Sequence, residues 1–355
     1  MHVPDGFIDA PVSLATGAVA ATAVAAGLRG ARRELDERTA PLAGLVAAFV
    51  FAAQMLNFPV AAGTSGHLLG GALAAILVGP WTGLLCISVV LLMQGVLFAD
   101  GGLTALGVNI TDMAVVTTAL GYGLFRLLAK ALPRRRSSVT AAAFVAALVS
   151  VPAAACAFTL VYALGGTTDV AIGKVFTAMV GVHVLIGIGE AVITALTVGA
   201  VMAVRPDLVH GARDLRRPLQ LRTAQGTTTV VPEAAPAAPA SPAPLRRVLA
   251  VGLAVAVVLA GFLSYYASTS PDGLEKVAHD KGIDSREKEH AAKDSPLADY
   301  QVKDVGDARL SGGLAGVIGV GATLAVGTGV FVVVRRRRGR AEEGAAAVSA
   351  GTGTS

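Results

Sequence analysis

The first two residues carry three nitrogen atoms that could surround a transition metal ion. The chain begins with the sequence MHVPDGF. The α-amine of Met1, the backbone nitrogen of His2 once it loses its proton, and Nδ1 of the His2 ring would close a five-membered and then a six-membered chelate ring. One further imidazole would complete a plane of four nitrogens, a geometry that suits Ni(II) or Cu(II). His is an ordinary second residue, so Met1 and His2 alone do not establish a metal site. The rest of the chain must supply the fourth ligand.

His67 is the candidate for that fourth ligand. It lies in the sequence GTSGHLLGG at residues 63–71, and besides His2 it is the only His in the first 180 residues. A neutral imidazole is a common metal ligand, and the flanking glycines would let the backbone approach the N-terminal segment closely. The alternative is an interfacial His that bonds to a loop carbonyl.

Other polar side chains lie within or at the ends of apolar segments, where a charge costs about 2.5–3.5 kcal/mol at the centre of a bilayer. These candidates are Asn57, Ser65, Gln94, Asn109, Asp112, His183 and Glu190. They could orient a ligand His through hydrogen bonds, or they could satisfy loop backbone groups. His183 and Glu190 are about two helical turns apart on one face, and they either serve transport or join helices.

The composition predicts an all-α integral membrane protein. Hydrophobic residues make up 54% of the chain and charged residues only 15%, which is too apolar for an ordinary soluble domain of this length. Stretches of about 20 apolar residues, enough to cross a bilayer, recur along the sequence. We expect nine spans, the second and third of them short, at 10–28, 41–57, 65–79, 81–98, 106–128, 139–163, 174–204, 246–267 and 311–334.

The basic residues predict the orientation of these spans. Most of the 29 Lys and Arg residues fall in alternate connections, around residues 29–38, 126–136, 205–247 and 335–340. Because basic connections are cytoplasmic, we expect the N-terminus outside and the C-terminus inside. No Lys or Arg precedes the first apolar run, unlike in a secretory signal, so we expect Met1 to be retained.

A change in composition divides the chain into two modules. We expect a seven-helix bundle at 1–205, a Pro/Ala/Thr-rich cytoplasmic linker at 206–244, a two-helix C-terminal module at 245–340 with an outside loop at 268–310, and a disordered tail at 341–355. Stretches rich in Pro form extended linkers, and a tail rich in Gly, Ala and Ser has too few apolar side chains to fold.

Several chemistries leave no trace in the sequence. It contains no phosphate-binding Gly-Lys-Ser/Thr loop, no cofactor motif and no nucleophile with an adjacent base, so we expect a protein that is not an enzyme. Cys86 and Cys156 lie inside apolar segments and lack metal-ligand spacing. The net charge of +5 reflects the basic cytoplasmic connections rather than nucleic-acid binding.

Several separated motifs together resemble the CbiM/NikM family, the metal-capturing membrane subunits of energy-coupling-factor cobalt and nickel transporters. The motifs are MHVPDGF at 1–7, GTSGHL at 63–68, the segment from Gln94 to Asn109 and the segment from His183 to Glu190. The resemblance covers residues 1–205. Residues 245–335, with the sequence PDGLE at 271–275, resemble the small two-span companion subunit of such transporters. Asp112 stands where family members often carry Asn.

The resemblance implies a ligand set and partners. The ion would be held by the amine of Met1, the backbone and ring nitrogens of His2, and the ring of His67. A transmembrane coupling subunit and two ATPase subunits would be separate chains. This chain would cross the plasma membrane of a bacterium or archaeon several times. No cofactor would be bound permanently, because the metal is the transported substrate.

Three hypotheses about function follow. The first is a substrate-binding permease for Ni(II) or Co(II) that captures the ion at the outer face. The second is a transporter driven by ion gradients, a class that often shows inverted repeats; the sequence shows no convincing repeat. The third is a structural scaffold whose PDGLE loop binds another protein. The sequence does not decide whether the ion is nickel or cobalt, since both ions can occupy nitrogen sites.

Overall fold

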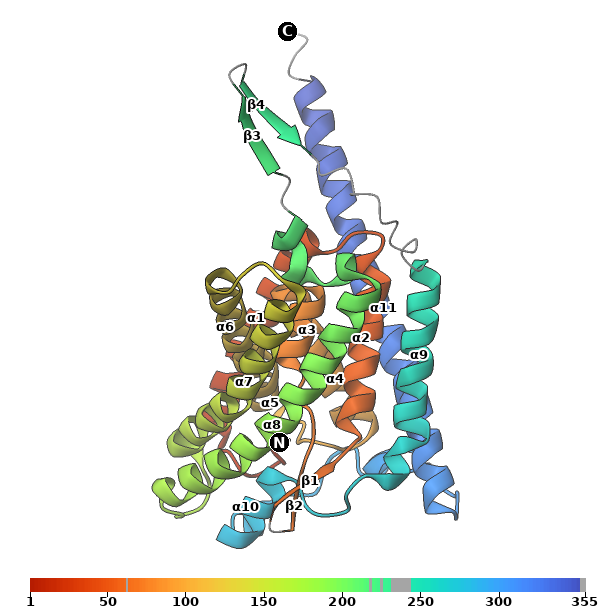
Figure 1. The fold of residues 1–355 in the computed structure, drawn as a ribbon. Helices are drawn as coiled ribbons and strands as arrows, with labels where there is room; N and C mark the ends of the chain where they lie inside the picture. The colour runs from red at the N-terminus through yellow and green to blue at the C-terminus, as the bar shows by residue number, and fades with distance from the viewer. Residues whose placement is uncertain (62, 217–218, 224–225, 231–243, 352–355) are drawn as a thin grey trace.

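The computed structural model describes residues 1–61, 63–216, 219–223, 226–230 and 244–351, and it consists mainly of long helices that run in roughly one direction (Figure 1). The helices are α1 (Ala10–Glu34), α2 (Thr39–Gln54), α3 (Gly71–Val78), α4 (Pro80–Leu97), α5 (Leu106–Asn109), the π-helix η1 (Ile110–Val116), α6 (Thr117–Ala131), α7 (Arg136–Gly165), α8 (Ile172–Val204), α9 (Leu245–Gly261), α10 (Gly273–Lys281) and α11 (Ala308–Gly351). Four strands form two hairpins: β1 (Phe58–Ala61) with β2 (Thr64–Gly66), and β3 (Leu219–Thr223) with β4 (Gly226–Val230). Short 3₁₀ turns are η2 (Pro206–Leu208), η3 (His210–Arg216), η4 (Leu263–Tyr266), η5 (Asp284–Arg286) and η6 (Ala298–Tyr300). The expected all-α membrane fold is confirmed.

Within the described residues, seven helices are long and apolar enough to cross a bilayer. They are α1, α4, the continuous helix Leu106–Ala131, α7, α8, the segment Leu245–Tyr266 and α11 up to Arg337. The other two expected spans are helical but short, because α2 has 16 residues and α3 only 8. Eight residues of helix extend about 12 Å, well below a bilayer core of about 30 Å. Two of the nine expected spans, α2 and α3, are therefore shorter than a helix that crosses a whole bilayer, as expected for the second and third.

Helix α2 lies at the centre of the molecule. All but three of its 16 residues are buried, and it packs against α3, α4, α9 and α11. A helix that is apolar on every side belongs in such a position. Its last residue, Gln54, donates from Nε2 to the carbonyl of Leu69 at 3.0 Å, so the end of α2 also supports the segment that carries His67.

The chain stops being helical between α2 and α3. Strand β1 pairs with β2, with Phe58 opposite Gly66, and Gly70 then turns with a φ of 85°. A left-handed residue of this kind suits glycine and interrupts a right-handed helix. Residues 65–70, expected to begin a span, therefore form a strand and an irregular segment, which places His67 in a loop at the start of a half-length helix.

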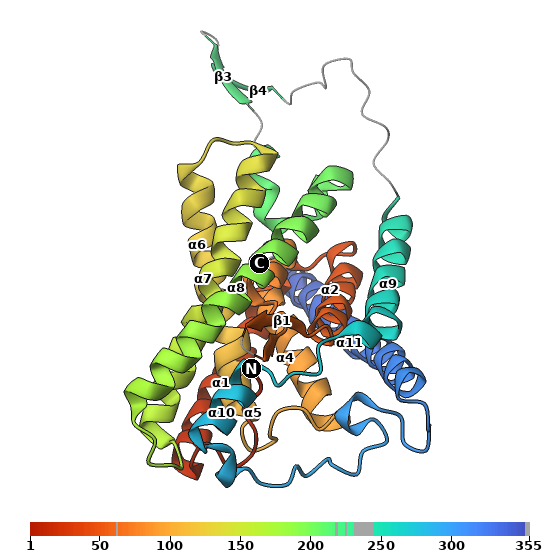
Figure 2. The ribbon, with the colours of Figure 1, turned by 60° about the horizontal axis from the view of Figure 1, so that its bottom comes forward.

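The C-terminal module packs directly on the first module. Helices α9 and α11 contact α2 and each other, and the connection between them, with α10, crosses the end of the bundle where the N-terminus lies (Figure 2). Backbone bonds fix this connection to the first module: Ser268 donates to Asn57 at 2.7 Å, Lys288 to Asp5 at 2.9 Å, and Asp299 to Phe98 at 2.9 Å.

Two segments differ from the expected linker and tail. Residues 206–230 include η2, η3 and the β3–β4 hairpin rather than an extended chain alone, while the Pro-rich stretch at 231–243 lies outside the described residues. Helix α11 continues to Gly351, so residues 341–351 of the tail expected to be disordered are helical, while residues 352–355 lie outside the described residues. The sequence AEEGAAAVSA explains this, because Ala is the strongest helix former.

Candidate metal-binding site

The N-terminal segment before α1 is buried inside the bundle. Met1 is 3% exposed, and Val3 and Phe7 are equally covered. Asn109 holds the segment with both ends of its amide: Oδ1 accepts from the Val3 N–H at 2.7 Å, and Nδ2 donates to the Val3 carbonyl at 3.2 Å. The Gly102 N–H donates to the same carbonyl at 2.9 Å. The amino group is therefore fixed at a defined place in the fold.

The loop at residues 98–105 approaches the N-terminal segment very closely. A side-chain carbon on Gly102 would lie 2.3 Å from the Asp5 nitrogen, so only glycine fits there. We expected the glycines beside His67 to make this approach, but a side-chain carbon on Gly66 would meet Ile186 instead, at 2.5 Å. Gly66 therefore allows the close approach of α8, and Gly102 allows the close approach of the N-terminal segment.

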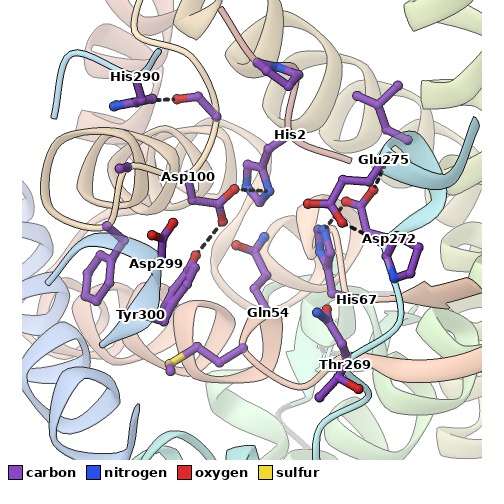
Figure 3. Close-up of a pocket in the computed structure, with 18 of the residues that line it drawn as sticks. His2, Gln54, His67, Asp100, Thr269, Asp272, Glu275, His290, Asp299 and Tyr300 are labelled. Atoms are coloured by element: carbon purple, nitrogen blue, oxygen red, sulfur yellow. Dashed lines mark hydrogen bonds and ion pairs between the residues drawn. The ribbon is translucent and has the colours of Figure 1, made fainter. Parts of the chain in front are cut away.

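His67 lies beside Asp272 in the site (Figure 3), and its ring contacts the amine of Met1. The amine nitrogen and His67 Nε2 are 2.7 Å apart. On the other side of the ring, Nδ1 lies 3.0 Å from the Leu68 carbonyl. Since a carbonyl can only accept, Nδ1 carries the proton and the lone pair of Nε2 is directed at the amine. A metal ligand needs this tautomer.

The His2 ring lies beside the His67 ring, with centroids 5.2 Å apart. Its Nδ1 is 3.2 Å from Asp100 Oδ1, and its Nε2 is 3.1 Å from Gln94 Oε1. Burial lowers the pKa of the His2 ring to about 4, against the opposing attraction of Asp100, which favours the neutral ring. In this state Nδ1 faces Asp100, so the chelate with the Met1 amine is open.

Asp272 completes the centre of the site, and the sequence reasoning did not single it out. Its Oδ2 is 2.6 Å from the Met1 amine and 3.5 Å from His67 Nε2. Burial alone would raise the pKa of Asp272, but the charge of the Met1 ammonium, the neighbouring His67 ring and the hydrogen bond from that ammonium hold this pKa well below its usual range. Asp272 is the N-cap of α10 in a capping box with Glu275, and this Asp-x-x-Glu spacing is visible in the sequence. The spacing predicts the helix start, but not the contact with Met1.

Asp100 and Tyr300, also missed in the sequence, hold Gln94. The Tyr300 hydroxyl donates to Asp100 Oδ2 at 2.6 Å and accepts from Gln94 Nε2 at 3.0 Å. Burial, followed by the negative charge of Asp100, raises the pKa of Tyr300 well above its usual value. This chain of bonds orients the Gln94 oxygen toward His2.

Glu190 and His183 reach the site from α8. Glu190 accepts from the backbone N–H groups of Leu69 and Gly70, at 2.6 and 3.0 Å, and so joins α8 to the segment that carries His67. Nδ1 of His183 bonds to the carbonyl of Met179 at 2.7 Å. Its Nε2 has no hydrogen-bond partner among the described residues, and its side chain lines a small space with Met1, His67 and Asp272.

The remaining candidates lie at different distances from the ligands. Ser65 donates from its hydroxyl to the Ser270 carbonyl at 2.8 Å, so it joins β2 to the C-terminal module. Asn57 lines the cavity described next. Asp112 is buried in η1, where its oxygens have no hydrogen-bond partner in the described part of the chain, and it does not line that cavity.

An open cavity of about 950 Å³ leads to these groups, and its lining includes His2, His67, Asp100 and Asp272. In the part of the chain that the structure describes, no three His, Cys, Asp or Glu side chains are grouped closely enough to hold a metal. The donors present include a main-chain amine. For bonds of about 2.0 Å, neighbouring donors at a right angle lie about 2.8 Å apart, which agrees with the 2.7 Å between Met1 and His67.

Comparison with known proteins identifies the family. Residues 2–208 match the CbiM family, described as a cobalt uptake substrate-specific transmembrane region. The chain belongs to the CbiM family. Residues 246–336 match the PDGLE domain, so this CbiM family member is fused to a PDGLE domain.

Relatives and solved structures cover mainly the CbiM region. A putative metal transport protein of Haloquadratum walsbyi is 42% identical over 209 residues, which cover 59% of this chain and 93% of the relative. A putative fused nickel transport protein NikMN of Archaeoglobus fulgidus is 39% identical over 215 residues, covering 59% of this chain and 68% of the relative. The crystal structure of a truncated transition metal transporter superimposes with a TM-score of 0.50 at 29% identity, covering 57% of this chain and 99% of that one.

Proposed function

We propose that this membrane protein captures Ni(II) or Co(II) with four nitrogens: the Met1 amine, the His2 backbone nitrogen, His2 Nδ1 and His67 Nε2. The observation that carries the proposal is the 2.7 Å separation of the Met1 amine and His67 Nε2, two groups 66 residues apart in sequence. Relatives named as cobalt or nickel transport proteins support the choice of ion.

Capture requires one local movement. The His2 ring must turn so that Nδ1 leaves Asp100, now 3.2 Å away, and closes the six-membered chelate ring with the His2 amide nitrogen. The amine and the His2 amide lose protons to the solvent as the metal binds, as metal ligands generally must. Gln94 Oε1, at 3.1 Å from Nε2, can then accept a hydrogen bond from Nε2–H. With the proton on Nε2, the lone pair of Nδ1 is free to bind the ion.

The protein works as one subunit of a larger importer in this proposal. A transmembrane coupling subunit and two ATPase subunits on other chains would drive release of the ion to the inside. The N-terminus and the cavity would face outside a bacterial or archaeal plasma membrane, because the basic connections at residues 29–38 and 126–136 lie at the opposite end of the bundle (Figure 1).

The N-terminal ligands can be tested directly. His2→Ala, and separately a Gly-Ser-Gly-Ser extension before Met1, should each abolish tight binding of NiCl₂ and CoCl₂ to the purified full chain in calorimetric titration. His2→Ala removes the ring ligand. The extension converts the Met1 amine into an amide, and because Met1 is only 3% exposed, the added residues have no room in the site. His279→Ala is the matched control, because that ring is 79% exposed. Binding that is unchanged in both N-terminal variants would refute the proposal.

A further inference from the structure

Asp272 brings a carboxylate from the second module to the nitrogen ligands of the first. Its Oδ2 lies 2.6 Å from the Met1 amine, 271 residues away in sequence, and 3.5 Å from His67 Nε2. The first separation is close to that expected between donors that share one ion, about 2.8 Å at right angles for bonds of about 2.0 Å, and the second corresponds to a wider angle at the ion. Figure 3 shows the carboxylate beside His67.

The carboxylate is held in place by its own helix. Oδ1 of Asp272 accepts from the Glu275 N–H at 2.8 Å, and Glu275 Oε2 accepts from the Asp272 N–H at 2.8 Å. This capping box uses one oxygen of Asp272 and leaves Oδ2 directed at the site. The orientation of Oδ2 therefore does not depend on the Met1 amine.

The same segment is fixed to the strand that precedes His67. Ser65 donates from its backbone N–H to the Pro271 carbonyl at 2.8 Å, and from its hydroxyl to the Ser270 carbonyl at 2.8 Å. Ser65 lies two residues before His67, so Asp272 and His67 are held as one unit. When His2 turns toward the amine, Asp272 stays where it is.

Charge also favours a carboxylate that stays. The empty site holds one ammonium and the Asp272 carboxylate, a neutral pair. A divalent ion that displaces one proton from the amine and one from the His2 amide leaves two positive charges on the metal, one negative charge on the amide nitrogen and one on Asp272. The net charge of the site is then the same as before, with Asp100 contributing one negative charge in both states, which avoids the high cost of an additional uncompensated buried charge.

We propose that Asp272 Oδ2 is a further ligand of the captured ion, so that the metal site is shared between the CbiM region and the PDGLE domain. This inference rests on the proposed nitrogen site and adds an oxygen donor outside its plane. The ion would then be five-coordinate rather than square-planar. An ion-pair partner that only blocks the empty site would behave in the opposite way, because its removal would strengthen metal binding.

The test compares Asp272→Asn and Asp272→Ala with the full-length chain in detergent. Asn is as good an N-cap as Asp, so the Asn variant keeps α10 and removes the charge. Asp280→Asn is the matched control, because it removes one carboxylate from the same helix at an exposed ion pair with Lys276. Titration with NiCl₂ and CoCl₂ should show affinity about 10- to 100-fold weaker in both Asp272 variants and unchanged in the control.

Nickel X-ray absorption provides a second readout that a merely structural role would not change. Planar four-coordinate Ni(II) shows a resolved edge shoulder that a fifth, axial ligand weakens. We expect the shoulder to be weaker in the parent chain than in Asp272→Ala. Equal or tighter binding in both variants, or identical edge spectra, would overturn the assignment of Asp272. A parent chain that binds neither metal would instead overturn the proposed function.

Discussion

Asn109 shows how a single residue keeps the amino end at the site. Both ends of its amide bond to Val3, at 2.7 and 3.2 Å, so the segment cannot slide without breaking both bonds. Neither backbone group of Val3 can reach water, since Val3 is completely buried. One side chain therefore fixes the register of the ligands that precede it.

Asn109→Ala should weaken Ni(II) binding. The change leaves the buried N–H of Val3 without its partner, which costs about 1–3 kcal/mol, or about 5- to 150-fold in affinity if the metal-bound state depends fully on this position. Calorimetric titration of the purified variant measures the loss. Thr111→Ala, which removes a bond from the same helix to the Thr16 carbonyl, should bind as the parent does, and a loss of equal size there would argue against a specific role for Asn109.

The half-length helix α3 is the element on which the site depends. It begins after the left-handed Gly70. The backbone N–H groups of Leu69 and Gly70, just before it, both donate to the carboxylate of Glu190 in α8. A helix that starts at this depth needs such a partner, because an unsatisfied N–H in an apolar surrounding is costly. Glu190 is therefore as much a part of the fold as of the site.

Glu190→Ala should destabilise this junction more than Glu190→Gln. The Ala variant leaves two buried N–H groups unsatisfied, at about 1–3 kcal/mol each, whereas Gln can still accept one of the bonds through its oxygen. We expect the midpoint of thermal denaturation in detergent to be highest for the parent, lower for Glu190→Gln and lowest for Glu190→Ala. Equal midpoints for the two variants would show that the carboxylate bonds add little.

Hydropathy predicted the long helices but not the break. Apolar runs identify α4, α7 and α8 because a bilayer requires about 20 such residues. The run at 65–79 is equally apolar, yet a left-handed Gly70 and the pairing of β1 with β2 depend on neighbours distant in sequence. The local composition of residues 65–79 therefore could not predict the break.

The ligand residues were predictable to different degrees for the same reason. His2 and His67 stand out as isolated imidazoles near or within apolar sequence, and Gln94, Asn109 and Glu190 stand out as polar residues at costly positions. Asp272 lies in a loop rich in charged residues, where one more carboxylate attracts no attention. Only the three-dimensional packing shows that it is 92% covered and bonded to Met1.

At the scale of the whole molecule, charge separates the two ends of the bundle. The N-terminus, β1, β2 and α10 lie at one end, and the connection between α6 and α7 lies at the other (Figure 1). That second connection carries Arg134, Arg135 and Arg136, all exposed. In the orientation that we propose from the positive-inside rule, the cavity faces outside.

Cysteine labelling in intact cells should confirm this orientation. In a chain lacking Cys86 and Cys156, Lys281→Cys should react with a membrane-impermeant maleimide, because residue 281 is exposed beside the cavity end of the bundle. Arg134→Cys should react only after the cells are opened. The reverse pattern would place the cavity on the cytoplasmic side.

The attachment of the PDGLE domain to the CbiM region has a consequence for assembly. A carboxylate on an independent protein would have to be recruited at whatever level the cell maintains, and some metal sites would lack it. A carboxylate on the same chain is present once per site, at an effective concentration that tethering can raise to about millimolar. Fusion of the two regions thus guarantees a one-to-one ratio of Asp272 to the histidines that it accompanies.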